Sequence, residues 1–102
     1  MKINNVKFVR FFVGDKEFDL PIQNIVGVNL TADDLAISIK VLNSNALDAI
    51  ISFFKTADEN PLFFICSDEK KENEIISVLG SFKSSSVLKG ICRLSFKREH
   101  EG

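Results

Sequence analysis

The sequence contains no tryptophan, no tyrosine and only one methionine, so its aromatic content consists of ten phenylalanines. Phenylalanine packs well in protein cores but offers no hydroxyl or indole group for a polar contact. We therefore expect most of the ten phenylalanines in the core.

Histidine, cysteine and glycine are also scarce, which disfavours most forms of catalysis. His100 is the only histidine and lies near the end of the sequence, where a catalytic histidine would lack an orienting partner. One histidine and two cysteines are a poor set of ligands for zinc or iron. The five glycines are scattered and match neither a P-loop nor a dinucleotide-binding loop. The acidic residues cluster in predicted turns, where solvated carboxylates are normal. We predict a protein that is not an enzyme and carries no metal or cofactor.

The two cysteines, Cys66 and Cys92, lie in apolar, strand-like runs, and we expect them to be buried free thiols. No stretch approaches an apolar membrane span, and the first residues lack the pattern of a signal peptide. The expectation is synthesis in the cytoplasm and no contact with a membrane.

The charges are nearly balanced, with 13 basic and 14 acidic side chains and a formal net charge of −1. A protein that mainly neutralises a phosphate backbone is expected to be strongly basic, so this balance argues against that role. A local basic stripe on the surface is compatible with this charge balance. The length of 102 residues and the hydrophobic content of 45% predict a single domain, 1–102, with a modest core.

Alternation of apolar and polar residues predicts a series of strands. The clearest is 35–42, in which Leu35, Ile37 and Ile39 alternate with smaller or polar residues. In the run NIVGVNL, the alternation places Val26 on one side with Val28 and Leu30. Strands are predicted over 6–13, 17–22, 24–30, 35–42, 62–67 and 87–99.

Punctuating residues predict where these strands end. Gly14 predicts a hairpin turn after the first strand, and Pro21 predicts an edge strand or a strand end. The serine-rich stretch KSSS, 83–86, predicts another turn before the last strand.

One helix is predicted over about 45–57, because Leu47, Ile50, Ile51 and Phe54 recur at helical spacing on one face. Residues 68–79 fit either a second helix or the turn and second strand of a hairpin, and we favour the hairpin. The predicted fold is α+β: an antiparallel β-sandwich or small barrel of six to seven strands with one central helix.

The stretch KFVRFF, 7–12, raises the question of a binding surface, because cations alternate there with phenylalanines. If the first and last strands are neighbours, their cations form one basic patch beside Phe8 and Phe11, which would suit the stacking of bases. The competing interpretation is a core strand whose cations lie at a surface or a subunit contact. The candidate interface or binding residues are Lys7, Arg10, Arg93, Lys97 and Arg98.

The order of elements resembles the tail-tube and baseplate-hub β-sandwich fold of phages. The residues that carry this resemblance are LAISIKVLNSNALDAIISFF, a strand running into a helix, followed by FFICSDEKKENEIISVLGSF and VLKGICRLSF. The resemblance implies a structural subunit of a phage tail, neck or baseplate that packs against itself or other assembly proteins, with a place in the virion. The same order also resembles the oligonucleotide-binding barrel.

Two functions are therefore carried forward. The first is a non-enzymatic structural subunit of an oligomeric assembly, acting through its strands and surfaces. The alternative is a small nucleic-acid-binding protein of the oligonucleotide-binding type, or a host-directed regulatory protein.

Overall fold

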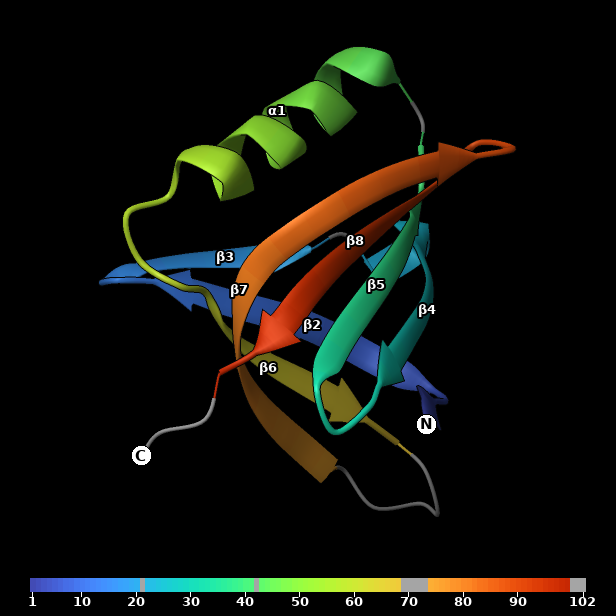
Figure 1. Ribbon diagram of the computed structural model, residues 1–102. Coiled ribbons are helices and arrows are strands. Elements are labelled where there is room, and N and C mark those ends of the chain that lie inside the picture. Colours follow the sequence, from blue (N-terminus) through green and yellow to red (C-terminus); the bar gives the residue numbers. More distant parts are fainter. Residues whose placement is uncertain (21, 42, 69–73, 100–102) are drawn as a thin grey trace.

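The computed structural model describes residues 1–20, 22–41, 43–68 and 74–99, and it confirms the α+β class: one helix and one antiparallel sheet of eight strands (Figure 1). The helix is α1 (Ser44–Thr56), and a short 3-10 helix, η1, spans Ile22–Asn24. The strands are β1 (Lys2–Ile3), β2 (Val6–Val13), β3 (Lys16–Leu20), β4 (Ile25–Leu30), β5 (Asp34–Lys40), β6 (Leu62–Ser67), β7 (Glu74–Leu88) and β8 (Ile91–Arg98).

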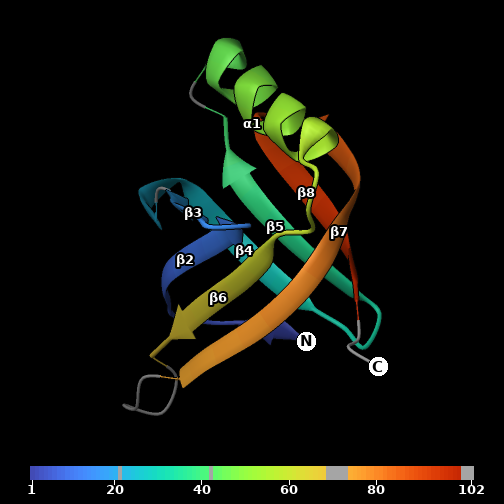
Figure 2. The same cartoon turned by 90° about the vertical axis from the view of Figure 1, so that its left-hand side faces the viewer.

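The sheet is open, with the strand order β1-β4-β5-β8-β7-β6-β2-β3, so β1 and β3 are its two edges. The longest strand, β7, joins two halves of the sheet, because residues 74–79 pair with β6 and residues 80–88 pair with β8. Figures 1 and 2 show β7 as a long curved strand between these halves. The predicted closure into a barrel is therefore absent from the described strands.

The sheet has more strands than the six to seven predicted, because β1 was missed. Two residues are too few to show a periodicity, and β1 is defined only by its pairing with β4. The backbone of Met1 extends this ladder, since its carbonyl accepts a hydrogen bond from the Leu30 amide at 2.8 Å.

The turn predicted at KSSS is wrong. Residues 84–86 lie within β7, each opposite a residue of β8, and the chain reverses instead at Lys89 and Gly90. These two residues have φ values of 52° and 76°, which a tight two-residue hairpin turn requires. Serine is acceptable inside a strand when one face of the strand is open to water.

Strand β4 carries a bulge that the sequence pattern did not indicate. Ile25 pairs with Ile39 and Gly27 pairs with Ser38, which leaves Val26 without an opposite residue. Val26 therefore turns away from the core and is 52% exposed, so its predicted place beside Val28 is wrong.

The strand predicted over 17–22 corresponds to β3 and ends earlier than predicted, at Leu20. Pro21, from which an edge strand or a strand end was predicted, lies outside the described ranges. The strand that precedes it, β3, is an edge strand.

The helix and the 62–79 hairpin agree with the sequence. Phe54 is buried, and Leu47, Ile50 and Ile51 pack against the core cluster, as the helical spacing predicted. Ser67 pairs with Glu74, so β6 and β7 form the hairpin and 74–79 is strand rather than helix. Residues 69–73 of the hairpin loop lie outside the described ranges.

The phenylalanines divide into two groups. Most of them form one network of ring contacts, with centroid distances of 4.8–6.3 Å, and Phe54 of α1 lies at its centre. This network confirms that most phenylalanines belong to the core; its members are Phe11, Phe18, Phe53, Phe54, Phe63, Phe82 and Phe96. The remaining three, Phe8, Phe12 and Phe64, lie on the opposite side of the sheet.

Candidate interaction surfaces

Strand β2, which contains KFVRFF, sends its aromatic side chains to both faces of the sheet. Val9 and Phe11 are buried in the core. Phe8 and Arg10 lie on the outer face, where the guanidinium carbon of Arg10 stands 5.3 Å from the centre of the Phe8 ring. Phe11 is therefore not available to stack a base, and the platform of Phe8 and Phe11 considered from the sequence does not exist.

An apolar surface covers the outer side of β2, β6 and the first half of β7. Phe12 and Phe64 contact each other edge to face at 5.6 Å, and Leu62 pairs with both Phe12 and Leu79. None of these side chains belongs to the core cluster or is packed against it, and Ile75 is 61% exposed. We call this surface the outer apolar face; its members are Phe8, Phe12, Leu62, Phe64, Ile75 and Leu79.

Arg10, within this face, is already neutralised. Its Nε lies 2.9 Å from Glu17 Oε1 and 2.9 Å from Asp19 Oδ1, both on the neighbouring strand β3. The hydrogen bond and the negative charge of Asp19 raise the pKa of Arg10 above its ordinary value. Lys7 is similarly paired with Asp68 at 3.4 Å. The cations of KFVRFF therefore face carboxylates of their own chain.

The five candidate cations do not share one surface through adjacent strands. Strand β2 carries Lys7 and Arg10, strand β8 carries Arg93, Lys97 and Arg98, and β7 and β6 lie between β8 and β2 in the sheet. Arg98 donates a hydrogen bond to the carbonyl of Thr31 at 2.9 Å. The first and last predicted strands are therefore not neighbours, and the combined basic patch considered from the sequence does not form. The alternation of apolar and polar residues could not show this, because strand order depends on long-range pairing.

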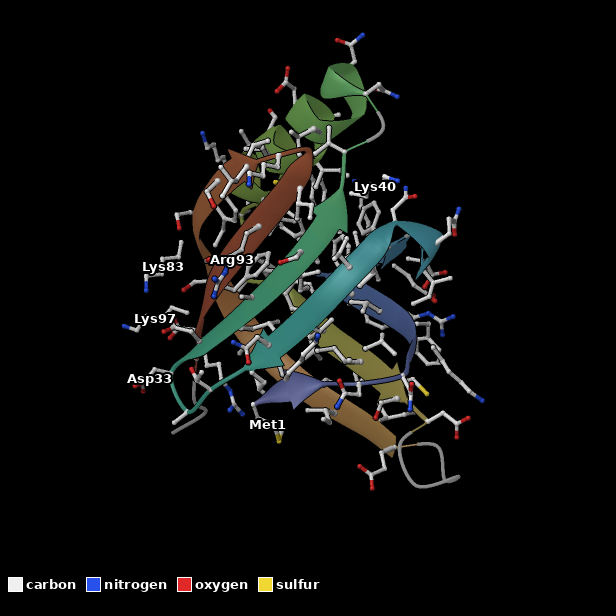
Figure 3. The ribbon with its side chains drawn as sticks, turned by 90° about the vertical axis from the view of Figure 1, so that its right-hand side faces the viewer. Met1, Asp33, Lys40, Lys83, Arg93 and Lys97 are labelled. Atoms are coloured by element: carbon white, nitrogen blue, oxygen red, sulfur yellow. The ribbon has the colours of Figure 1, made fainter. Side chains whose placement is uncertain are left out.

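A separate basic surface occupies the outer side of β5 and β8. Arg93 stands between Ser38 and Ser86 on the two adjacent strands, and Lys97 is about 13 Å further along β8. We call Lys40, Arg93 and Lys97 the cationic face (Figure 3). None of the three forms an ion pair with a residue in the described ranges, whereas nearby Lys83 pairs with Asp34 at 3.4 Å.

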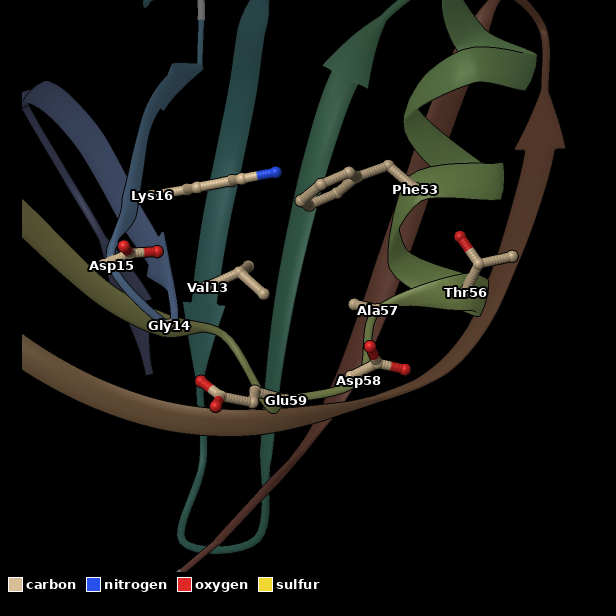
Figure 4. A pocket seen from close by; sticks show the side chains of 9 residues that line it. All are labelled: Val13, Gly14, Asp15, Lys16, Phe53, Thr56, Ala57, Asp58 and Glu59. Atoms are coloured by element: carbon tan, nitrogen blue, oxygen red, sulfur yellow. The ribbon is translucent and has the colours of Figure 1, made fainter.

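An acidic pocket of about 340 Å³ lies between the β2–β3 turn and the end of α1 (Figure 4). Asp15, Asp58 and Glu59 line it, together with Lys16 and the ring of Phe53. Across the described parts of the chain, no three histidine, cysteine or acidic side chains are grouped so that they could hold a metal ion. The only histidine, His100, lies outside those ranges.

Both cysteines are free and buried, as the sequence predicted. Desolvation raises the pKa of the Cys92 thiol above its ordinary value, so less of the reactive thiolate forms at a given pH. We expect Ellman's reagent to leave both thiols unmodified in the native protein at mildly alkaline pH and to titrate both after unfolding in urea. Rapid modification of a native thiol would contradict this expectation.

The fold and these surfaces define the chain as a small α+β protein whose sheet carries an apolar and a basic outer surface. Comparison with protein-family models, curated proteins and solved structures found no match in any of the three. No helix among the residues that the structure describes is long and apolar enough to cross a membrane.

Proposed function

We propose that this chain is a non-enzymatic structural subunit of a protein assembly, and that the outer apolar face packs against a second copy of the chain. The observation that carries the proposal is the presence of three phenylalanines and three aliphatic side chains on the outer side of the sheet, separate from the core. Of these six side chains, Ile75 is exposed and the other five are half-buried. Contiguous apolar surface that stays accessible to solvent is characteristic of protein interaction sites.

A second copy suits this face because the face carries charges of both signs. Arg10 pairs with Glu17 and Asp19 within the chain, and in a two-fold arrangement the same cation and carboxylates can also interact with those of the other copy. Nucleic acid suits it less, because the local carboxylates outnumber the guanidinium and would repel phosphate.

The narrower form of the proposal is a component of a phage tail, neck or baseplate, which would place the protein in the virion. Its support is the order of elements along the chain: strands, one helix, a hairpin and a final strand. The assembly proposal does not depend on this narrower form.

The test is the substitution Ile75→Lys, which places a charge in the outer apolar face at a side chain that is exposed in the single chain. If the face is buried between copies, the dissociation constant for the association of two copies should rise at least about tenfold, because the lysine charge would be desolvated in the interface without a partner. Size-exclusion chromatography with light scattering measures the mass directly.

The matched control is Leu88→Lys, on the same strand but at the β7–β8 hairpin, where Leu88 is 73% exposed. This variant should assemble like the wild type. A wild-type protein with the mass of one chain at all concentrations, or equal effects of the two substitutions, would contradict the proposal.

The alternative function, nucleic-acid binding, is supported by the cationic face. Three cations that form no ion pair with a described residue, one of which (Arg93) lies between two serines, are suited to a phosphate backbone, although no phenylalanine accompanies them to stack bases. In the same chromatography run, co-purifying nucleic acid would be conspicuous by its ultraviolet absorbance, because the chain contains no tryptophan or tyrosine. Absorbance that is lost in Arg93→Glu or at high salt would favour this alternative.

A further inference from the structure

Strand β3 leaves one row of backbone groups unpaired, because it is an edge of the sheet. The turn between β2 and β3 has two residues, Gly14 and Asp15, and the closing pair is Val13 with Lys16. In such a hairpin the closing pair exchanges hydrogen bonds, and every second pair after it does the same. The backbone N–H and C=O groups of Glu17 and Asp19 therefore point to the free edge.

Helix α1 lies beyond this free edge, with no strand between it and β3 (Figure 1). The two elements touch through Phe53 and Phe18, whose ring centroids are 4.8 Å apart. Beside this contact is a cleft of about 230 Å³, which we call the β3–α1 cleft. Its lining is almost entirely apolar and consists of Phe11, Phe18, Asp19, Leu20, Ala49, Ile50, Phe53 and Phe54.

We propose that the β3–α1 cleft binds an extended segment of another protein, which adds to β3 as a ninth strand alongside α1. Backbone hydrogen bonds to Glu17 and Asp19 would supply affinity, and an apolar side chain in the cleft would supply specificity. The cleft is smaller than a pocket for a drug-sized ligand, and its size suits an anchoring side chain.

The side chains of β3 indicate the chemistry of this segment. Phe18 and Leu20 face the core side, so the partner residues on that side should be apolar. Glu17 and Asp19 face the outer side, where their two carboxylates exceed the single guanidinium of Arg10, so the partner residues there should be lysine or arginine. The expected ligand is a strand in which apolar and basic residues alternate.

A second copy of β3 fits this edge poorly. In an antiparallel pair, residues directly opposite each other point to the same face of the sheet. Each antiparallel register that joins two β3 edges therefore places Glu17 or Asp19 opposite an acidic residue of the other copy. Like charges directly opposite each other are destabilising. The edge therefore disfavours its own copy and favours a different, basic segment. The proposal does not rest on self-assembly through the outer apolar face, although Glu17 and Asp19 border both surfaces.

The probe for the test is a fluorescein-labelled peptide of about six residues with alternating valine and lysine. Fluorescence anisotropy should show saturable binding to the wild-type chain. A peptide of the same pattern with glutamate in place of lysine should bind at least about tenfold more weakly, because its charges would face Glu17 and Asp19.

Asp19→Pro removes one free-edge amide without removing a hydrogen bond between β2 and β3, and it should weaken binding of the probe about three- to tenfold. Asp19→Ala loses the same carboxylate but keeps the amide, so the difference between the two variants isolates the backbone contact. Circular dichroism checks that both variants are folded.

A second pair of variants tests the cleft. Ala49→Gln places a polar side chain in it and should abolish binding of the probe, whereas Ser52→Gln, at an exposed position of α1 outside the cleft lining, should leave binding unchanged. Absence of saturable binding, or equal affinity for Asp19→Pro and Asp19→Ala, would overturn the proposal. Loss of binding in Ile75→Lys, with these variants unaffected, would move the peptide to the outer apolar face and would equally overturn it.

Discussion

Replacing Phe96 by alanine is expected to lower the free energy of unfolding by about 3–5 kcal/mol. Phe96 is fully buried on β8, and its ring contacts the rings of Phe54 from α1 and Phe63 from β6 at 5.0 and 4.8 Å. The substitution would leave a cavity between the helix and both halves of the sheet. Urea denaturation followed by circular dichroism measures the loss, since there is no tryptophan whose fluorescence could be used.

The matched control is Phe8→Ala, because Phe8 is chemically identical but lies on the outer face of β2. Its ring contacts Arg10 and is not packed against the core, so its removal should cost less than about 1 kcal/mol. Similar losses for the two substitutions would mean that Phe8 is as deeply packed as Phe96 and that the outer apolar face is not an open surface.

Gly80→Val is expected to destabilise the protein by about 3 kcal/mol. Gly80 lies in β7 where its pairing changes from β6 to β8, and an added Cβ would stand 3.0 Å from Cβ of Phe96 and 3.4 Å from the carbonyl oxygen of Lys97. Neither atom is the end of a flexible side chain, so the two strands would have to move apart. Thermal and urea unfolding would both report the loss.

Gly27→Val provides the comparison within the same sheet. A Cβ at Gly27 meets no atom within 4 Å, and valine favours strands, so this substitution should change stability by less than about 0.5 kcal/mol. If Gly80→Val were equally harmless, the close approach of β7 to Phe96 would not exclude a side chain at position 80.

The elements that could be predicted are those whose hydrophobic period is clear over enough residues. Leu35, Ile37 and Ile39 alternate in β5, and Leu47, Ile50 and Phe54 recur at helical spacing in α1, and all six pack in or against the core. The two residues of β1 and the bulge at Val26 carry no such period. Both exist because of their pairing with other strands, β1 with β4 and β4 with β5.

The candidate sites were harder to predict than the fold. Lys7, Arg10, Arg93 and Lys97 are all surface cations, as expected from their alternation with apolar residues, but strand order separates the first two from the last two. The sequence also held no indication that Glu17 and Asp19 would neutralise Arg10, since that contact depends on the register of the β2–β3 hairpin. The β3–α1 cleft joins residues from two distant parts of the chain and could not be anticipated.

The sequence by itself determined the α+β class, the helix, most of the strands and the burial of both cysteines, because these follow from local periodicity and from side-chain hydrophobicity. Only the tertiary structure decided which side of KFVRFF is inside. Both sides of β2 are apolar, so periodicity gives equal weight to either face. The choice was made by the partners of β2: the ring network around Phe11 covers one side, and no such network covers Phe8 and Phe12 on the other.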